Sequence, residues 1–121
     1  MQKWNREALA WAAGFYDGEG CICVQQPSGV CLDIKIAQVD LRPLKRFLGA
    51  VCFGKIAGPY TRENRPKSKP FYYYRVNKWE DVQQVICCLW NWLSEPKKEQ
   101  IVKCFKKVRE KRVYTLNRNL V

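Results

Sequence analysis

The sequence predicts an α+β protein in the order αββαββαα, built around an antiparallel sheet. Two stretches, 21–37 and 53–76, alternate apolar and polar residues on either side of a turn or polar loop, as β-hairpins do. Segments with helical spacing of apolar residues precede each hairpin, and two more follow the second. No internal repeat is present, so the 121 residues are expected to form a single domain over 1–121.

Each of the four expected helices has a start or stop signal. Asn5 and Asp40 are suitable N-caps for the first two. The run Asn77-Lys-Trp-Glu80 has capping-box spacing, and Ser94-Glu-Pro96 separates the third helix from the fourth. Gly18 and Gly20 are expected to end the first helix. The expected ranges are 6–16, 41–48, about 77–93 and 97–112.

The four expected strands pair as two hairpins. Val30, Leu32, Ile34 and Ile36 alternate with polar or small residues, which predicts one buried face and one face open to water or a ligand. A Pro-Ser-Gly turn joins the first pair of strands, and a charged loop over 58–69 joins the second. The expected strands are 21–26, 30–37, 53–57 and 70–76.

The charge of the chain indicates a polyanionic partner. The sequence has 22 Lys+Arg against 11 Asp+Glu, a formal net charge of +11, with basic clusters in 62–69 and 97–112. Hydrophobic residues make up 47% of the chain and include five Trp, which excludes a disordered basic tail. An anionic membrane is the alternative partner. The basic helix lacks the wide apolar face of an interfacial anchor, so we expect nucleic acid and no membrane.

Residue types that are absent or oddly spaced narrow the chemistry. The chain has no histidine, which excludes Ser-His-Asp triads, Cys-His dyads and histidine-bound metals. The seven cysteines form no C-x-x-C pair, and we interpret them as reduced packing residues rather than zinc ligands. No run reaches the ~20 apolar residues of a membrane span. We expect an intracellular protein, in a prokaryotic cytoplasm or an organelle matrix, that is not exported.

The segment 12–20 reads Ala-Ala-Gly-Phe-Tyr-Asp-Gly-Glu-Gly and holds two acids at the end of a helix. The helix dipole is negative there, so Asp17 and Glu19 are each unfavourable by about 0.3–1 kcal/mol. Clustered acids of this kind are stabilised by a cation, and hard oxygen ligands favour Mg²⁺. The alternative is that both are ordinary surface acids in a helix-ending turn.

The same segment resembles the signature of the LAGLIDADG homing endonuclease family. Ala13, Gly14, Asp17 and Gly20 match the name motif, and Glu19 supplies its second acid, where the family usually has Asp. The resemblance extends over nearly the whole chain. Three further segments fall where the family has them: Ile36-Ala37-Gln38, Gly54-Lys55-Ile56 and Lys97-x-x-Gln100. It implies an antiparallel sheet shaped as a DNA-binding saddle.

Residue roles follow from the resemblance position by position. Glu19 matches the metal ligand, for Mg²⁺ or Mn²⁺, helped by the backbone carbonyl of Gly18. Gln38 matches the polar residue near the attacking water. Lys97 matches the lysine beside the scissile phosphate, with Lys98 as the alternative.

The number of motifs bears on assembly. One chain carries one motif, whereas cutting both strands needs two sites, so the resemblance implies a homodimer and a pseudo-palindromic DNA target. Small residues of the motif helix would let two such helices approach closely. The residues expected at this interface are Ala10, Ala13, Gly14 and Asp17.

Strand parity and charge select the residues that contact DNA. Arg, Lys and Gln can read guanine or adenine edges, Asp can accept from cytosine, and Cys can contact thymine methyl groups. The family resemblance also implies that Arg42 lies near the scissile phosphate. The full expected set is Cys21, Cys23, Gln25, Asp33, Lys35, Arg42, Arg62, Arg65, Lys67, Lys69, Tyr73 and Arg75.

The sequence therefore predicts an intron-encoded homing endonuclease that cleaves double-stranded DNA by metal-assisted hydrolysis. One alternative is a nuclease-inactive RNA maturase of the same fold, with host intron RNA as its partner. Another is a DNA-binding regulator that never cuts. Glu19 favours the nuclease, because a splicing role needs no metal ligand.

Overall fold

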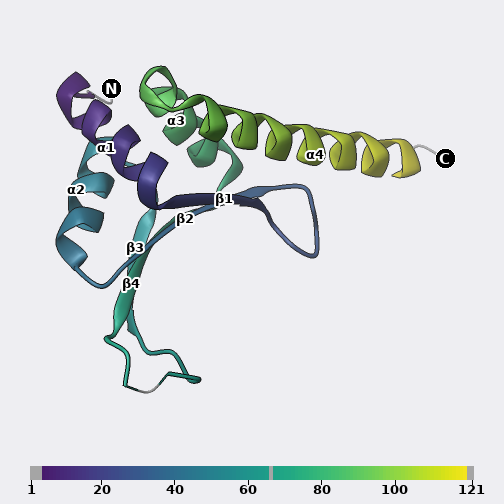
Figure 1. Cartoon of the computed structure of the whole chain (residues 1–121). Coiled ribbons are helices and arrows are strands. Elements are labelled where there is room, and N and C mark those ends of the chain that lie inside the picture. The colour runs from purple at the N-terminus through teal and green to yellow at the C-terminus, as the bar shows by residue number, and fades with distance from the viewer. Residues whose placement is uncertain (1–3, 66, 120–121) are drawn as a thin grey trace.

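The computed structural model describes residues 4–65 and 67–119 and has the expected α+β architecture. Four antiparallel strands form one sheet in the order β1-β2-β4-β3, and all the helices lie on one face of it (Figure 1). The elements are α1 (Arg6–Glu19), β1 (Gly20–Val24), β2 (Leu32–Gln38), α2 (Leu41–Val51), β3 (Lys55–Tyr60), β4 (Phe71–Val76), α3 (Trp79–Leu89), the 3₁₀ turn η1 (Trp90–Trp92) and α4 (Glu95–Asn119).

The core lies between the sheet and the helices. The inward residues of β2, Leu32, Ile34 and Ile36, are at most 1% exposed. They pack with Leu44 and Phe47 of α2 in the cluster that also contains the buried residues of α1 and α3. Alternation along β2 therefore buries one face and leaves the other open, as the sequence predicts.

Two of the expected caps are confirmed and one is wrong. The Asn5 side chain accepts a hydrogen bond from the Ala8 amide, and the Asp40 side chain accepts one from the Arg42 amide. Lys78, not Asn77, is the N-cap of α3, and it makes no side-chain capping hydrogen bond. Helix α3 also ends at Leu89, because the chain tightens into the 3₁₀ turn before reaching Leu93.

Two helices are longer than expected. Helix α1 continues through Gly18 to Glu19, because glycine is tolerated inside a helix that packing supports. Helix α4 begins at Glu95, since Pro96 fits the first turn, where no helical amide partner is needed. It ends at Asn119, well beyond Arg112. Of the described residues, no helix is long and apolar enough to cross a membrane.

Gly20 ends α1 and begins β1, and packing explains why this residue is glycine. Its amide donates to the Tyr16 carbonyl. A Cβ at this position would overlap the Tyr16 ring, which is only 2% exposed. The sharp change from helix to strand delivers Glu19 to the surface immediately beside the sheet.

Candidate functional site

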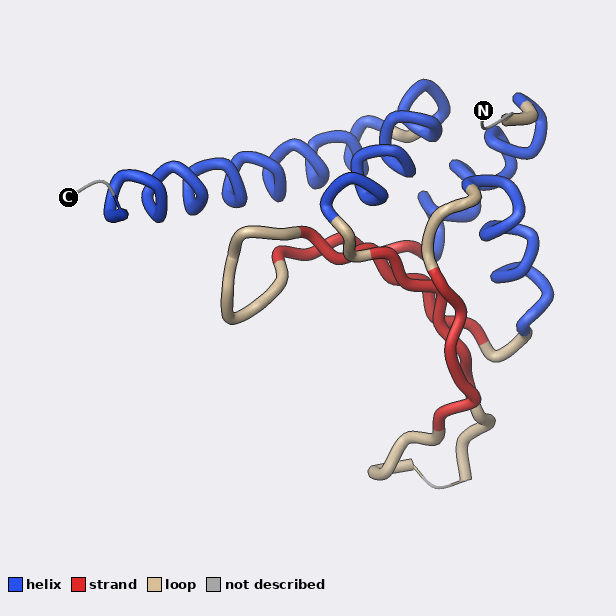
Figure 2. Tube along the Cα trace, turned by 180° about the vertical axis from the view of Figure 1, so that it is seen from behind, coloured by secondary structure: helices blue, strands red, loops and turns tan. Residues whose placement is uncertain are grey.

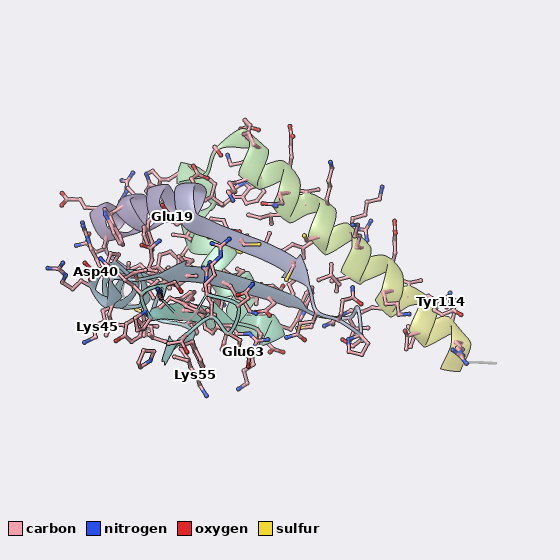
Figure 3. The ribbon with its side chains drawn as sticks, turned by 60° about the horizontal axis from the view of Figure 1, so that its bottom comes forward. Glu19, Asp40, Lys45, Lys55, Glu63 and Tyr114 are labelled. Carbon is pink, nitrogen blue, oxygen red and sulfur yellow. The ribbon has the colours of Figure 1, made fainter. Side chains whose placement is uncertain are left out.

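The C-terminal end of α1 brings together two of the predicted site residues. Gly20 pairs with Ile36, so the start of β1 lies beside the end of β2. Gln38, the last residue of β2, donates from Nε2 to Oε2 of Glu19 at 3.1 Å. The Glu19 side chain is exposed at this end of the helix (Figure 3).

Lys97 completes this group. Its Nζ donates to the Gly20 carbonyl at 2.8 Å and lies 5.4 Å from the centre of the Tyr16 ring. Lys98, the alternative, points elsewhere: it is 3.7 Å from the Glu95 carboxylate and 5.4 Å from the centre of the Trp90 ring. Of the two lysines, only Lys97 has its Nζ against the Gly20 carbonyl at the end of α1.

The ring of Tyr16 lies next to the Lys97 ammonium group. Burial raises the pKa of its hydroxyl well above the usual value, so Tyr16 stays neutral. Its hydroxyl oxygen is buried with no hydrogen-bond partner among the described residues. The ring thus supports Lys97 through its face, while its polar end contributes no hydrogen bond.

Asp17, the first acid of the motif, has a structural partner. Its carboxylate accepts from the Ser94 amide at 3.1 and 3.2 Å and from the Ser94 hydroxyl at 3.1 Å. Ser94 immediately precedes α4, so Asp17 fixes the start of the helix that carries Lys97. Asp17 was expected at a dimer interface, but in the structure its carboxylate is bonded to Ser94 of its own chain.

The expected interface set also needs correction. Ala13 is 0% exposed in the core of its own chain, so its placement at a dimer interface is wrong. Gly14 and Gly18 lie on the outer face of α1, where an added Cβ would meet no atom within 4 Å. Ala10 is half-buried on the same face. The exposed small-residue stripe is therefore Ala10, Gly14 and Gly18, at intervals of four residues.

The residues present fit a divalent cation only in part. Glu19 offers one exposed carboxylate, and the Gly18 carbonyl belongs to the last turn of α1, where carbonyls lack helical partners. Within 4–65 and 67–119, no three acidic or thiol side chains are close enough to hold an ion. Mg²⁺ typically takes one or two protein carboxylates plus phosphate oxygens and waters, so this donor set suits an ion that is also bound by a nucleic-acid phosphate.

The open face of the sheet carries a row of cations. Lys35 lies opposite Arg75, and Arg75 lies opposite Lys55, so three basic residues cross three neighbouring strands. Like charges directly opposite one another destabilise a sheet. A polyanion bound on this face would remove that repulsion. Lys55 is not among the DNA contacts expected from the sequence, although its position in the second hairpin, opposite Arg75, is a signal that could identify it.

Asp33 is the exception on this face. It is 5% exposed, because it accepts two hydrogen bonds from Nε of Arg75 and one from Nη2. The expectation that Asp33 is open to a cytosine is therefore wrong: its oxygens are occupied by Arg75. The ion pair raises the pKa of Arg75 further above its usual value.

The other predicted contacts on the sheet are accessible. Cys21 and Cys23 are exposed on the edge strand β1, while Gln25 is half-buried just beyond it. Desolvation raises the pKa of the Cys23 thiol, and the nearby Asp33 adds to this, so the thiol stays neutral. Tyr73 is half-buried, with Nζ of Lys35 lying 5.6 Å from its ring centre.

The basic loop between β3 and β4 extends away from the helices (Figure 2). Its four predicted DNA contacts are exposed: Arg62, Arg65, Lys67 and Lys69. Arg42 is also exposed, but Asp40 holds its guanidinium at 2.6 Å. The hydrogen bonds from Arg42 lower the pKa of Asp40 to about 2.

Comparison with solved structures identifies the fold. The chain is similar to the homing endonuclease I-TnaI, with 20% sequence identity and a TM-score of 0.62 over 99% of this chain and 80% of that one. It is also similar to the LAGLIDADG homing endonuclease I-GzeII in complex with its DNA target, with 20% identity and a TM-score of 0.62 over 100% of this chain and 40% of that one. The chain has the LAGLIDADG homing endonuclease fold.

A third similar structure is an archaeal intron-encoded homing endonuclease complexed with DNA, with 20% identity and a TM-score of 0.56. That match covers 69% of this chain, which spans about half of the archaeal protein (54%). No family model matches the sequence, and no curated protein is significantly similar to it. The LAGLIDADG fold thus rests on structural similarity. Residues 12–19 of the motif occupy α1, and Gly20 begins β1.

Proposed function

We propose that the chain is a divalent-metal-dependent DNA endonuclease that acts as a homodimer on a long pseudo-palindromic double-stranded target. The observation that carries the proposal is the meeting of Glu19, Gln38 and Lys97 at the end of α1. Gln38 ends β2, the strand that also contributes Lys35 to the Lys35–Arg75–Lys55 row. The fold shared with DNA-bound homing endonucleases supports it.

Each residue of the group has a role in hydrolysis. Glu19 and the Gly18 carbonyl would hold Mg²⁺ or Mn²⁺, which when bound supplies an activated water and neutralises phosphate charge. Gln38, held against Glu19, would orient the attacking water through its side-chain amide. Lys97 would neutralise the charge that develops on the scissile phosphate. No strong general base is required of the chain, which agrees with its lack of histidine.

The homodimer is proposed through the exposed face of α1. Ala10, Gly14 and Gly18 present little side-chain bulk there, which allows a second helix to approach closely. A two-fold axis beside this face would bring two Glu19 sites together and join two open sheets into one saddle. Such a dimer would read two related half-sites, with base edges contacted from the sheet and phosphates contacted from the loop over 61–70.

The test is cleavage of a randomised duplex library in Mg²⁺, followed by sequencing of the cut ends. The wild-type protein is compared with Glu19→Gln, and with Glu110→Gln as a control that removes an exposed acid from α4. Cut ends that define a long two-fold site, made by wild type and Glu110→Gln but not by Glu19→Gln, would support the proposal. Binding of nucleic acid without cleavage by any of the three proteins would overturn it and favour the maturase, whose ligand is structured intron RNA.

A further inference from the structure

An apolar groove lies between α3 and α4, in the helical layer of the molecule. It encloses about 610 Å³ and is lined from one side by Trp79, Ile86 and Trp90. Val102, Phe105 and Leu116 of α4 line the other side. Trp79, Trp90 and Phe105 are only partly buried, so the groove exposes aromatic and aliphatic surface to solvent.

Helix α4 extends this surface beyond the body of the protein (Figure 1). Residues 109–118 are all exposed, although they include Val113 at 52% and Leu116 at 61%. Val102, Phe105, Arg109, Val113 and Leu116 follow one another at intervals of three or four residues. This is the spacing of a seam that packs against another helix, and Arg109 is its only charged position.

The charge around the groove is positive. Lys106, Arg109 and Arg112 line it together with the apolar residues, and in the described chain none of the lining residues is acidic. Arg112 is fixed in place: its guanidinium lies 4.1 Å from the centre of the Trp79 ring, and its Nε donates to the Val30 carbonyl at 2.7 Å. The groove thus has an apolar floor and a basic rim.

We propose that the α3–α4 groove binds an acidic amphipathic helix of a partner protein. The apolar side chains of that helix, three and four residues apart, would pack on Val102, Phe105, Val113 and Leu116. One of its carboxylates would face Arg109. Apolar contacts alone would allow many amphipathic helices to bind. The basic residues around the groove favour a helix with negative charge, and charge complementarity therefore indicates an acidic partner.

Two other occupants fit the groove less well. A second copy packed through α4 would set basic helix against basic helix, since residues 97–112 hold eight Lys or Arg and two Glu. Nucleic acid would need free aromatic faces on which its bases could stack. Arg112 already lies 4.1 Å from the centre of the Trp79 ring and Lys98 lies 5.4 Å from the centre of the Trp90 ring, and the remaining lining is largely aliphatic, so stacking in the groove is restricted.

The groove is separate from the candidate active site. Its lining residues do not include Glu19, Gln38 or Lys97. The helices that form it cover one face of the sheet (Figure 2), whereas Lys35 and Arg75 belong to the strand positions of the opposite face. The partner helix and a bound duplex would therefore not compete. The inference does not depend on nuclease activity and is tested without DNA.

The experiment uses two fluorescently labelled synthetic peptides with the same apolar stripe of Leu. One carries Glu at the position facing Arg109 and at the flanking positions, and the other carries Lys there. Anisotropy titrations of the full chain are expected to give micromolar binding of the Glu peptide and about tenfold weaker binding, or none, of the Lys peptide. Arg109→Glu is expected to reverse this order. Leu116→Asp is expected to weaken the Glu peptide about tenfold, while the control Val39→Asp, at an exposed residue outside the groove, leaves it unchanged.

Circular dichroism establishes that each variant is folded. Equal binding of the two peptides, or no preference change in Arg109→Glu, would overturn the acidic partner. Self-association of wild type that Leu116→Asp abolishes would show that a second copy covers the groove instead. Displacement of the Glu peptide by a short RNA from wild type but not from Arg109→Glu would assign the groove to nucleic acid and also overturn the proposal.

Discussion

Arg75 of β4 forms a hydrogen-bonded ion pair with Asp33 of β2 on the open face of the sheet. Its Nε lies 2.9 and 3.1 Å from the two carboxylate oxygens, and its Nη2 lies 2.8 Å from one of them. The Asp33 side chain is 7% exposed, whereas that of Arg75 is 45% exposed. The pair therefore fixes the guanidinium from beneath, and its outer edge, which includes Nη1, is not used by Asp33.

We predict that Asp33 controls the base specificity of Arg75 rather than the strength of DNA binding. In Asp33→Asn the guanidinium loses its charged partner, so preference for one base pair in each half-site is expected to fall about tenfold. Overall affinity should not fall, because the substitution removes a negative charge from the sheet face that is proposed to contact DNA. Enrichment of bound duplexes from a randomised library measures both quantities without cleavage. Glu63→Gln makes the same charge change in the exposed loop and should keep the preference. Loss of affinity with unchanged specificity in Asp33→Asn would contradict the prediction.

A second prediction separates the two lysines at the start of α4. Lys97→Met removes the Nζ that bonds the Gly20 carbonyl beside Glu19 and is expected to slow cleavage about a hundredfold or more, with DNA binding largely kept. Lys98→Met removes a side chain that faces Glu95 and Trp90, so its cleavage rate should stay close to wild type. Single-turnover cleavage of a sequence recovered from the library measures both. A similar decrease in cleavage rate in the two variants would contradict a specific role for Lys97 beside the scissile phosphate.

Periodicity gave most of the fold, because strand alternation and helix caps are local signals. The sheet faces follow directly from the alternation along residues 30–37, and Asn5 and Asp40 were recognisable as caps. Helix limits were less predictable, since packing carried α1 through Gly18 and nothing in the sequence marked where α4 ends. The ends of α1 and α4 were predicted wrongly because tertiary packing and the persistence of a long helix, rather than local propensity, determine where these helices end.

For the candidate site too, some residues could be predicted from the sequence, whereas contacts between distant segments could not. Glu19, Gln38 and Lys97 were predicted from the resemblance, and the structure places all three at the end of α1. The partners of Asp17 and Asp33 could not be found from sequence. Asp17 is 77 residues from Ser94 in the sequence, and Asp33 is 42 residues from Arg75. Each acid also had another plausible role, at a dimer interface for Asp17 and in contact with cytosine for Asp33. Parity placed Asp33 on the correct face but could not reveal that Arg75 would bury it.

Two buried tyrosines give a prediction about stability. The Tyr16 hydroxyl has no hydrogen-bond partner among the described residues, so Tyr16→Phe should leave the free energy of unfolding unchanged or raise it by about 1 kcal/mol. The Tyr74 hydroxyl donates to the Phe53 carbonyl at 2.5 Å, so Tyr74→Phe should lower the free energy of unfolding by about 1–2 kcal/mol. Urea denaturation of the two variants measures the difference. A destabilised Tyr16→Phe would reveal a partner, such as a bound water, for that hydroxyl.

The last prediction tests the proposed dimer through two glycines that are equivalent in the single chain. Gly14 in α1 and Gly49 in α2 both lie on exposed helical surface, and a Cβ at either position meets no atom within 4 Å. Leucine is a better helix former than glycine, so neither Gly14→Leu nor Gly49→Leu should destabilise the isolated fold. Only Gly14 lies on the small-residue stripe of α1, where a larger side chain would hold a second helix away. Sedimentation equilibrium is expected to show a dimer for wild type and Gly49→Leu and a monomer for Gly14→Leu. A dimer that survives Gly14→Leu would place the subunit contact on a different surface, and the two Glu19 sites would then not be brought together by α1.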